Sequence, residues 1–97
     1  MEINWHPEAL EDLRSFDEQV QNRITRHVSR LQNGPFGENT SLVSKQGLEL
    51  FRLKLKSDEL DHRIFFDLEG GDVVILGVEH RDDAYSQESI ENIKSRT

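Results

Sequence analysis

The chain has 97 residues, of which 12 are Lys or Arg and 19 are Asp or Glu, so its formal net charge is −7. It has no cysteine, which excludes a disulfide framework and thiolate chemistry, and no apolar run approaches the ~20 residues of a membrane-spanning helix. We expect one domain over residues 1–97, without a signal peptide and in the cytoplasm, whose acidic total charge argues against general nucleic-acid binding.

The N-terminal third predicts a short strand and two helices. Ile3 and Trp5 alternate as in a strand, and Pro7 is suited to the first position of a helix. The Ser-Phe-Asp-Glu run at residues 15–18 resembles a capping box, which indicates a break and a second helix. That helix carries an apolar stripe at helical spacing, made of Val20, Ile24, Val28 and Leu31. The Asn-Gly-Pro run at residues 33–35 is expected to stop it.

The remainder of the chain predicts strands. Residues 36–46 read as a loop with at most a brief strand at residues 42–43, and residues 51–56 alternate strictly between apolar and basic side chains. Residues 61–85 predict two more strands joined at Gly70 and Gly71, because a two-residue type I′ turn needs positive φ at both positions. The predicted fold class is α+β, with an antiparallel-rich sheet of three to four strands packed on the N-terminal helical hairpin.

The Gly-Gly turn also predicts a register for the last two strands. Uninterrupted pairing gives four facing pairs: Leu68 with Val73, Phe66 with Ile75, Ile64 with Gly77, and Arg63 with Val78. One sheet face is then apolar and suited to burial against helices. The opposite face carries Arg63 among apolar side chains, where an arginine needs an anion, a carboxylate or water.

Three cations are predicted to gather on that opposite face. If Lys54 pairs with Arg63, then Arg52, Lys54 and Arg63 share one side of adjacent strands, where like charges repel one another. This arrangement favours a surface that binds an anion. The alternative is a solvated strand face whose cations form ion pairs with Asp61 and Asp67.

Arg81 and Tyr85 follow the last strand and could close one end of this surface. Simple alternation would turn Arg81 toward the core, so we expect the strand to end or bulge at His80. The alternative is an ion pair of Arg81 with Asp82 or Asp83 beside a tyrosine at the rim.

A short C-terminal helix is predicted to begin at residues 86–89. Ile90 and Ile93 are its only large apolar residues. Because helices in proteins are stabilised mainly by packing an apolar face, we expect this helix to be loosely attached.

The four histidines do not predict a metal site. No His-x-His or His-x-x-x-His spacing occurs, and the predicted register places His62 and His80 on opposite faces. His80, next to Arg81, could assist proton transfer because histidine titrates near neutrality; the alternative is a hydrogen-bonded histidine at the rim.

The order of these elements resembles the RelE/ParE toxin superfamily of type II toxin–antitoxin systems, and more closely its RelE-like branch. The resemblance extends over nearly the whole chain and is most specific in the runs HRIFFDLE and VILGVEHRDDAY. Three features differ from the family pattern. Glu79 stands where the family usually has glycine, the loop at residues 57–61 is longer and more acidic, and the whole chain is acidic whereas RNA-cutting relatives are usually basic.

The resemblance implies a metal-independent mRNA endoribonuclease (mRNA interferase) without a cofactor, which cuts mRNA on the ribosome by attack of the ribose 2′-hydroxyl on the phosphate. By position it implies four catalytic residues, Lys54, Arg63, Arg81 and Tyr85. It implies RNA binding by three more, Arg52, Lys56 and His80. It also implies a cognate antitoxin that neutralises the toxin in a hetero-oligomer. Two alternatives stay open: a ParE-like DNA gyrase inhibitor without nuclease activity, and an inactive RelE-like binding module.

Overall fold

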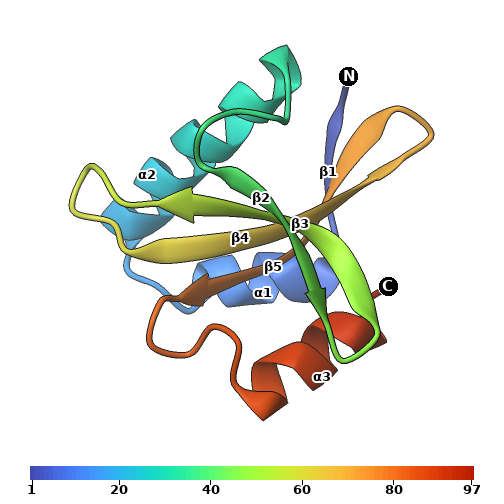
Figure 1. The fold of residues 1–97 in the computed structure, drawn as a ribbon. Coiled ribbons are helices and arrows are strands. Elements are labelled where there is room, and N and C mark those ends of the chain that lie inside the picture. The colour runs from blue at the N-terminus through green and yellow to red at the C-terminus, as the bar shows by residue number, and fades with distance from the viewer.

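A computed structural model describes all 97 residues as one α+β unit with a five-stranded sheet. The elements in chain order are β1 (Ile3–Trp5), α1 (Pro7–Arg14), α2 (Glu18–Ser29), the 3₁₀ turn η1 (Arg30–Asn33), β2 (Thr40–Lys45), β3 (Leu48–Leu55), β4 (His62–Glu69), β5 (Asp72–His80) and α3 (Gln87–Ser95). The strand order across the sheet is β1-β5-β4-β3-β2, and only the β1–β5 pair is parallel (Figure 1).

The sheet has one strand more than the predicted three to four. β2 covers six residues instead of a brief segment at residues 42–43, because the tight Gln46-Gly47 turn, with positive φ at both residues, pairs it with β3. β1 extends the other edge by pairing with β5. No helix combines the length and the apolar composition that crossing a membrane requires.

The two N-terminal helices begin and end at local capping signals. Pro7 is in the first turn of α1, and the His6 side chain accepts a hydrogen bond from the Glu8 amide at 3.1 Å. The predicted break at residues 15–18 is confirmed, but the cap of α2 is Asp17, whose carboxylate accepts from the Val20 amide at 3.0 Å.

The sheet separates two apolar clusters. The larger cluster joins α1 and α2 to one face, with Ala9, Leu13, Ile24, Val28, Leu31, Leu55, Leu60, Ile64, Phe66, Val73, Ile75 and Val78. The smaller cluster joins α3 to the other face, with Val43, Leu48, Leu50, Phe65, Leu76, Ile90 and Ile93. Figure 1 shows α3 beneath the β2–β3 turn, where the Lys94 ammonium donates to the Gln46 carbonyl at 2.7 Å.

A bulge in β5 corrects the predicted register. The pairs nearest the turn, Leu68 with Val73 and Phe66 with Ile75, are confirmed. The register then shifts, so that Phe65 pairs with Gly77, Ile64 with Val78, and Arg63 with Glu79. Leu76 is the extra residue, and Leu76 contributes to the α3 cluster while Val78 joins the α1–α2 cluster. The bulge therefore comes four residues before His80, where it was expected.

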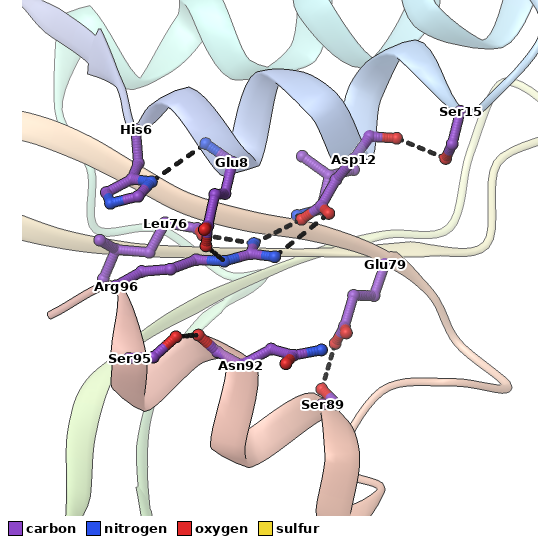
Figure 2. Close-up of polar contacts among 11 residues, drawn as sticks. His6, Glu8, Asp12, Ser15, Leu76, Glu79, Ser89, Asn92, Ser95 and Arg96 are labelled. Carbon is purple, nitrogen blue, oxygen red and sulfur yellow. Dashed lines mark hydrogen bonds and ion pairs between the residues drawn. The ribbon is translucent and has the colours of Figure 1, made fainter.

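Two charged side chains form hydrogen bonds with backbone groups of β5 at the bulge, where β1 no longer runs beside this strand. The Asp12 carboxylate accepts a hydrogen bond from the Val78 amide at 3.1 Å, and Arg96 donates to the Leu76 carbonyl at 2.9 Å. Arg96 also contacts Asp12 at 2.6 Å and Glu8 at 3.0 Å, as Figure 2 shows. Although burial alone would lower the pKa of Arg96, the hydrogen bond and charge of Asp12 outweigh it and raise that pKa.

The C-terminal helix is better anchored than predicted. Ser86 caps its start, and Ile90 and Ile93 are 4% and 1% exposed. The prediction of loose attachment counted only apolar residues and did not include the ion pairs that Arg96 makes with α1.

Gly77 lets α3 approach β5. A Cβ atom at residue 77 would collide with the Cδ1 atom of Ile93. We expect Gly77→Ala to lower the free energy of unfolding by about 1–3 kcal/mol, the usual cost of overpacking a core. Chemical denaturation would measure it. Ile93→Val removes the colliding atom, so Gly77→Ala should cost clearly less in that background; an equal cost in both backgrounds would contradict this explanation.

Candidate functional site

A group of cations, called here the basic surface, gathers on and beside the face of the sheet opposite α1 and α2. Arg52, Lys54 and Arg63 are on β3 and β4, and Lys56 and Arg81 follow just beyond the ends of β3 and β5. The predicted pairing of Lys54 with Arg63 is confirmed, and Arg52 pairs with Phe65 one step along the strands. Because their apolar neighbours on β3 turn toward the helices, Arg52 and Lys54 lie on the opposite side.

Two of the cations share one carboxylate. Arg63 is 5% exposed, and its Nη1 atom lies 3.3 Å from Asp61 Oδ1 and 3.1 Å from the His62 carbonyl oxygen. The Arg81 side chain is 65% exposed, and its Nη1 atom lies 3.5 Å from the other oxygen of Asp61. Asp61 therefore bridges Arg63 and Arg81. The ion pair of Arg63 with Asp61 is one of the alternatives drawn from the sequence, whereas the alternative ion pair of Arg81 with Asp82 or Asp83 is not formed.

The bridge keeps Asp61 ionised. Burial raises the pKa of its carboxyl group, but the hydrogen bond from Arg63 and the charges of Arg81 and Arg63 outweigh that effect and lower the pKa below its usual value. Asp61 thus places a negative charge between the two arginines, where it would compete with an anionic ligand.

One lysine of the basic surface, Lys54, has a perturbed pKa. The charge of Lys56, followed by burial and by the charges of Arg52 and Arg63, lowers the pKa of the Lys54 ammonium. A lysine whose pKa is lowered gives up its proton more readily and becomes a better general base. Lys56 also lines a shallow depression with Leu60, Asp61 and Arg81.

Tyr85 closes the other end of the basic surface. Arg52 donates a hydrogen bond to the Tyr85 hydroxyl and another, at 2.7 Å, to Ser41. The tyrosine ring packs edge-on against Phe65, and the Lys45 ammonium lies 5.5 Å from the ring centre. Tyr85 has a φ of 70°, a strained value for an aromatic residue that α3 and these contacts maintain.

Sequence reasoning missed Lys45 and Ser41. Both are on β2, and the signal that could have located them is the Gln46-Gly47 turn. Counting back from that turn pairs Lys45 with Leu48 and Ser41 with Arg52. They therefore face the same side as the basic surface.

His80 lies apart from the other residues of the predicted site. Because of the bulge it pairs with His62, and the two rings lie 5.2 Å apart, with His62 also against Phe16. The prediction that His62 and His80 lie on opposite faces is wrong, and His80 turns toward the helices. Burial and the charge of His80 lower the pKa of His62.

Glu79 pairs with Arg63 on the neighbouring strand, but its side chain is hydrogen-bonded to α3. The Ser89 hydroxyl of α3 donates a hydrogen bond to its carboxylate (Figure 2). Burial raises the pKa of Glu79, and the hydrogen bond from Ser89 only partly offsets this.

One comparison identifies a family, and another finds solved structures of similar fold. The family model for the ParE toxin of type II toxin–antitoxin systems, parDE, matches residues 3–85. A solved structure of the E. coli toxin RelE in the free state, a mutant in which two arginines are replaced by alanine, superposes on this chain with a TM-score of 0.70. The two sequences are 16% identical, and the match covers 98% of this chain and 95% of that chain.

Two toxin–antitoxin complexes are similarly close. The RelBE2 complex from Mycobacterium tuberculosis contains a chain with a TM-score of 0.69, 17% identity, and coverage of 82% of this chain and 96% of that one. The RelE–RelB complex from Pyrococcus horikoshii gives a TM-score of 0.66, 19% identity, and coverage of 86% and 97%. At these identities the likeness shows the fold. The curated proteins include no match.

Removing the carboxylate between the two arginines should strengthen anion binding. We expect Asp61→Asn to raise the affinity for inorganic phosphate about two- to fivefold, because partly exposed ion pairs are weak competitors. Isothermal titration calorimetry would measure it, with Asp82→Asn as the control because Asp82 contacts His80 instead of the arginines. Equal affinities of wild type and Asp61→Asn would show that Asp61 does not compete for the site.

The raised pKa of Glu79 makes the stability depend on pH. The stabilising contribution of Glu79 to the free energy of unfolding is fully present below pH 4.5, the ordinary pKa of a glutamate. It is lost as the pH rises through the raised pKa that Glu79 has in the folded protein. Glu79→Gln should therefore melt at a higher temperature than wild type at pH 7, and the difference should shrink as the pH falls toward 4.5. Glu38→Gln, at an exposed loop position, is the control; a difference independent of pH would refute the titration of Glu79 as its cause.

Proposed function

The chain belongs to the family of ParE toxins of type II toxin–antitoxin systems, within the RelE/ParE superfamily, and we propose that it is a toxin that cleaves messenger RNA on the ribosome. The observation that carries this proposal is the basic surface. A chain with a net charge of −7 places Lys54 beside Arg63, and Arg81 one carboxylate away. Neighbouring cations repel one another and so destabilise the sheet, but together they can bind a phosphodiester and stabilise its transition state.

The chemistry requires no metal. The ribose 2′-oxygen forms a bond to the neighbouring phosphorus, and the bond from phosphorus to the 5′-oxygen breaks. Lys54 accepts the 2′ proton, and its lowered pKa brings it closer to the operating pH of a general base. Arg63 and Arg52 stabilise the added negative charge of the transition state, and Arg81 protonates the departing 5′-oxygen or offsets its charge.

The remaining parts of the surface position the substrate. Tyr85, already packed against Phe65 and held by Arg52, presents a ring on which a base can stack. The scissile phosphate must displace Asp61 from Arg63 and Arg81 to reach both arginines. The ribosome then supplies the orientation that a site without a histidine pair lacks, which places this activity in the cytoplasm.

A ParE-like DNA gyrase inhibitor is the second candidate. Two observations favour it: the matching family model is that of ParE toxins, and the total charge of −7 is unusual for an RNA-binding protein. In that case the basic surface would contact a protein, and no phosphodiester bond would be cut. A catalytically inactive RelE-like binding module is the remaining alternative.

A cognate antitoxin is the expected partner under either candidate. Solved structures of similar fold are RelE–RelB complexes from Mycobacterium tuberculosis and Pyrococcus horikoshii. We infer that this chain likewise forms a hetero-oligomer with a small antitoxin, which would neutralise it by covering the basic surface.

Cleavage of a defined mRNA on purified ribosomes tests the proposal. We expect wild type to cut in the ribosomal A site, and Arg81→Ala to cut about 100-fold more slowly or worse, because a transition-state charge contact is lost. Arg81 is exposed, so its truncation should leave the melting temperature within a few degrees. Arg14→Ala, which removes an exposed arginine of α1, is the control.

A gyrase supercoiling assay run in parallel separates the two candidates. Ribosome-dependent cleavage with unaffected gyrase supports the nuclease. Gyrase inhibition with intact mRNA would refute it, and full cleavage by Arg81→Ala would remove Arg81 from the mechanism.

A further inference from the structure

A pocket of about 350 Å³ lies at the edge of the sheet next to Lys54. β2 runs beside β3 only as far as Thr40, which pairs with Leu53, and the Lys54 amide then donates to the Asn39 carbonyl at 2.9 Å. Beyond that point the loop at residues 34–39 leaves the sheet. The last residues of β3 are therefore paired with β4 on one side only, and the pocket fills the space between their open edge, η1 and the loop.

The lining of the pocket combines positive charge with apolar surface. Four basic residues line it, namely His27, Arg30, Lys54 and Lys56, against one acidic residue, Glu38. Leu31, Leu53 and Leu55 supply the apolar part. The Arg30 guanidinium lies 3.3 Å from the ring Nδ1 of His27, and Asp58 lies 3.7 Å from the other nitrogen of that ring. Arg30 has no carboxylate within ion-pair distance, so its charge is available to a ligand.

The pocket shares two residues with the basic surface. Lys54 belongs to both, and Lys56 lines this pocket as well as the depression that holds Asp61 and Arg81. A chain of phosphates bound between Arg63 and Arg81 would therefore pass Lys56 on its way to the pocket. The volume is at the lower end of the 300–1,000 Å³ range of small-molecule sites, which suits one nucleotide.

We propose that this pocket is a nucleotide-binding subsite for single-stranded RNA, which holds a nucleotide next to the scissile bond. Arg30, Lys54 and Lys56 provide the positive charge for its phosphate, and the leucines provide an apolar surface for its base or sugar. This inference rests on the proposed function and adds a binding residue, Arg30, on the helical side of the molecule, outside the strands that carry the other cations.

Calorimetric titration with 5′-AMP tests the subsite without requiring cleavage. We expect wild type to bind 5′-AMP more tightly than inorganic phosphate, and Arg30→Ala to weaken AMP binding about tenfold, as loss of a hydrogen bond to a charged group does. Arg14→Ala removes the same charge from α1, away from the pocket, and should bind as wild type does.

Three results would overturn the proposal: no AMP binding by wild type, equal affinity for AMP and phosphate, or equal weakening by Arg14→Ala and Arg30→Ala. Binding of an acidic peptide instead of AMP, again dependent on Arg30, would replace the RNA subsite by a protein-docking site.

Cleavage on the ribosome separates this inference from the proposed function. Arg30-dependent AMP binding by a wild-type protein that cuts no mRNA would contradict the nuclease but leave the nucleotide pocket. If the wild-type protein cuts mRNA, and the Arg30→Ala variant binds AMP and cuts mRNA as well as wild type does, the nucleotide-binding subsite is contradicted. The proposed nuclease function is then unaffected.

Discussion

The bulge in β5 is the constraint on which the rest of the molecule depends. The extra residue, Leu76, lets the strand serve both apolar clusters, since Leu76 packs under α3 while Val78 packs against α1 and α2. The polar groups that a bulge leaves free at a sheet edge are costly unless they are bonded, and Asp12 and Arg96 satisfy them from opposite ends of the chain. One ion pair thus joins α1, β5 and α3, and α3 in turn fixes the position of Tyr85.

The electrostatics of the basic surface follow from this geometry. Repulsion among the cations on β3 and β4 is reduced by Asp61, which stands between Arg63 and Arg81. A bridging carboxylate holds the two arginines at a spacing that a phosphate could take over, so Asp61 both assembles the site and competes with its ligand. The acidic loop at residues 57–61, which supplies Asp61, therefore has a physical consequence at the site itself.

Alternation and turn chemistry predicted most of the fold but could not predict the bulge or the ion pairs. The Gly70-Gly71 turn predicted the correct register for the pairs of β4 and β5 nearest to it. The pairing of Lys54 with Arg63 between β3 and β4 was a supposition, which the structure confirms. A glycine inside a strand is a known sign of a bulge, and Gly77 was that sign. The contacts of Asp61 and Arg96 depend on how loops and helices fold back over the sheet, which no local pattern contains.

The central claim is that the scissile phosphate binds on the sheet face that carries Lys54, Arg63 and Arg81. Electron cryomicroscopy of the protein on a ribosome, with a 2′-O-methylated codon in the A site to prevent cleavage, tests it most directly. We predict the scissile phosphate within hydrogen-bonding distance of Arg63 and Arg81, with Asp61 displaced from at least one of them. A protein that presents α1 and α2 to the codon, or that does not occupy the A site, would contradict the claim.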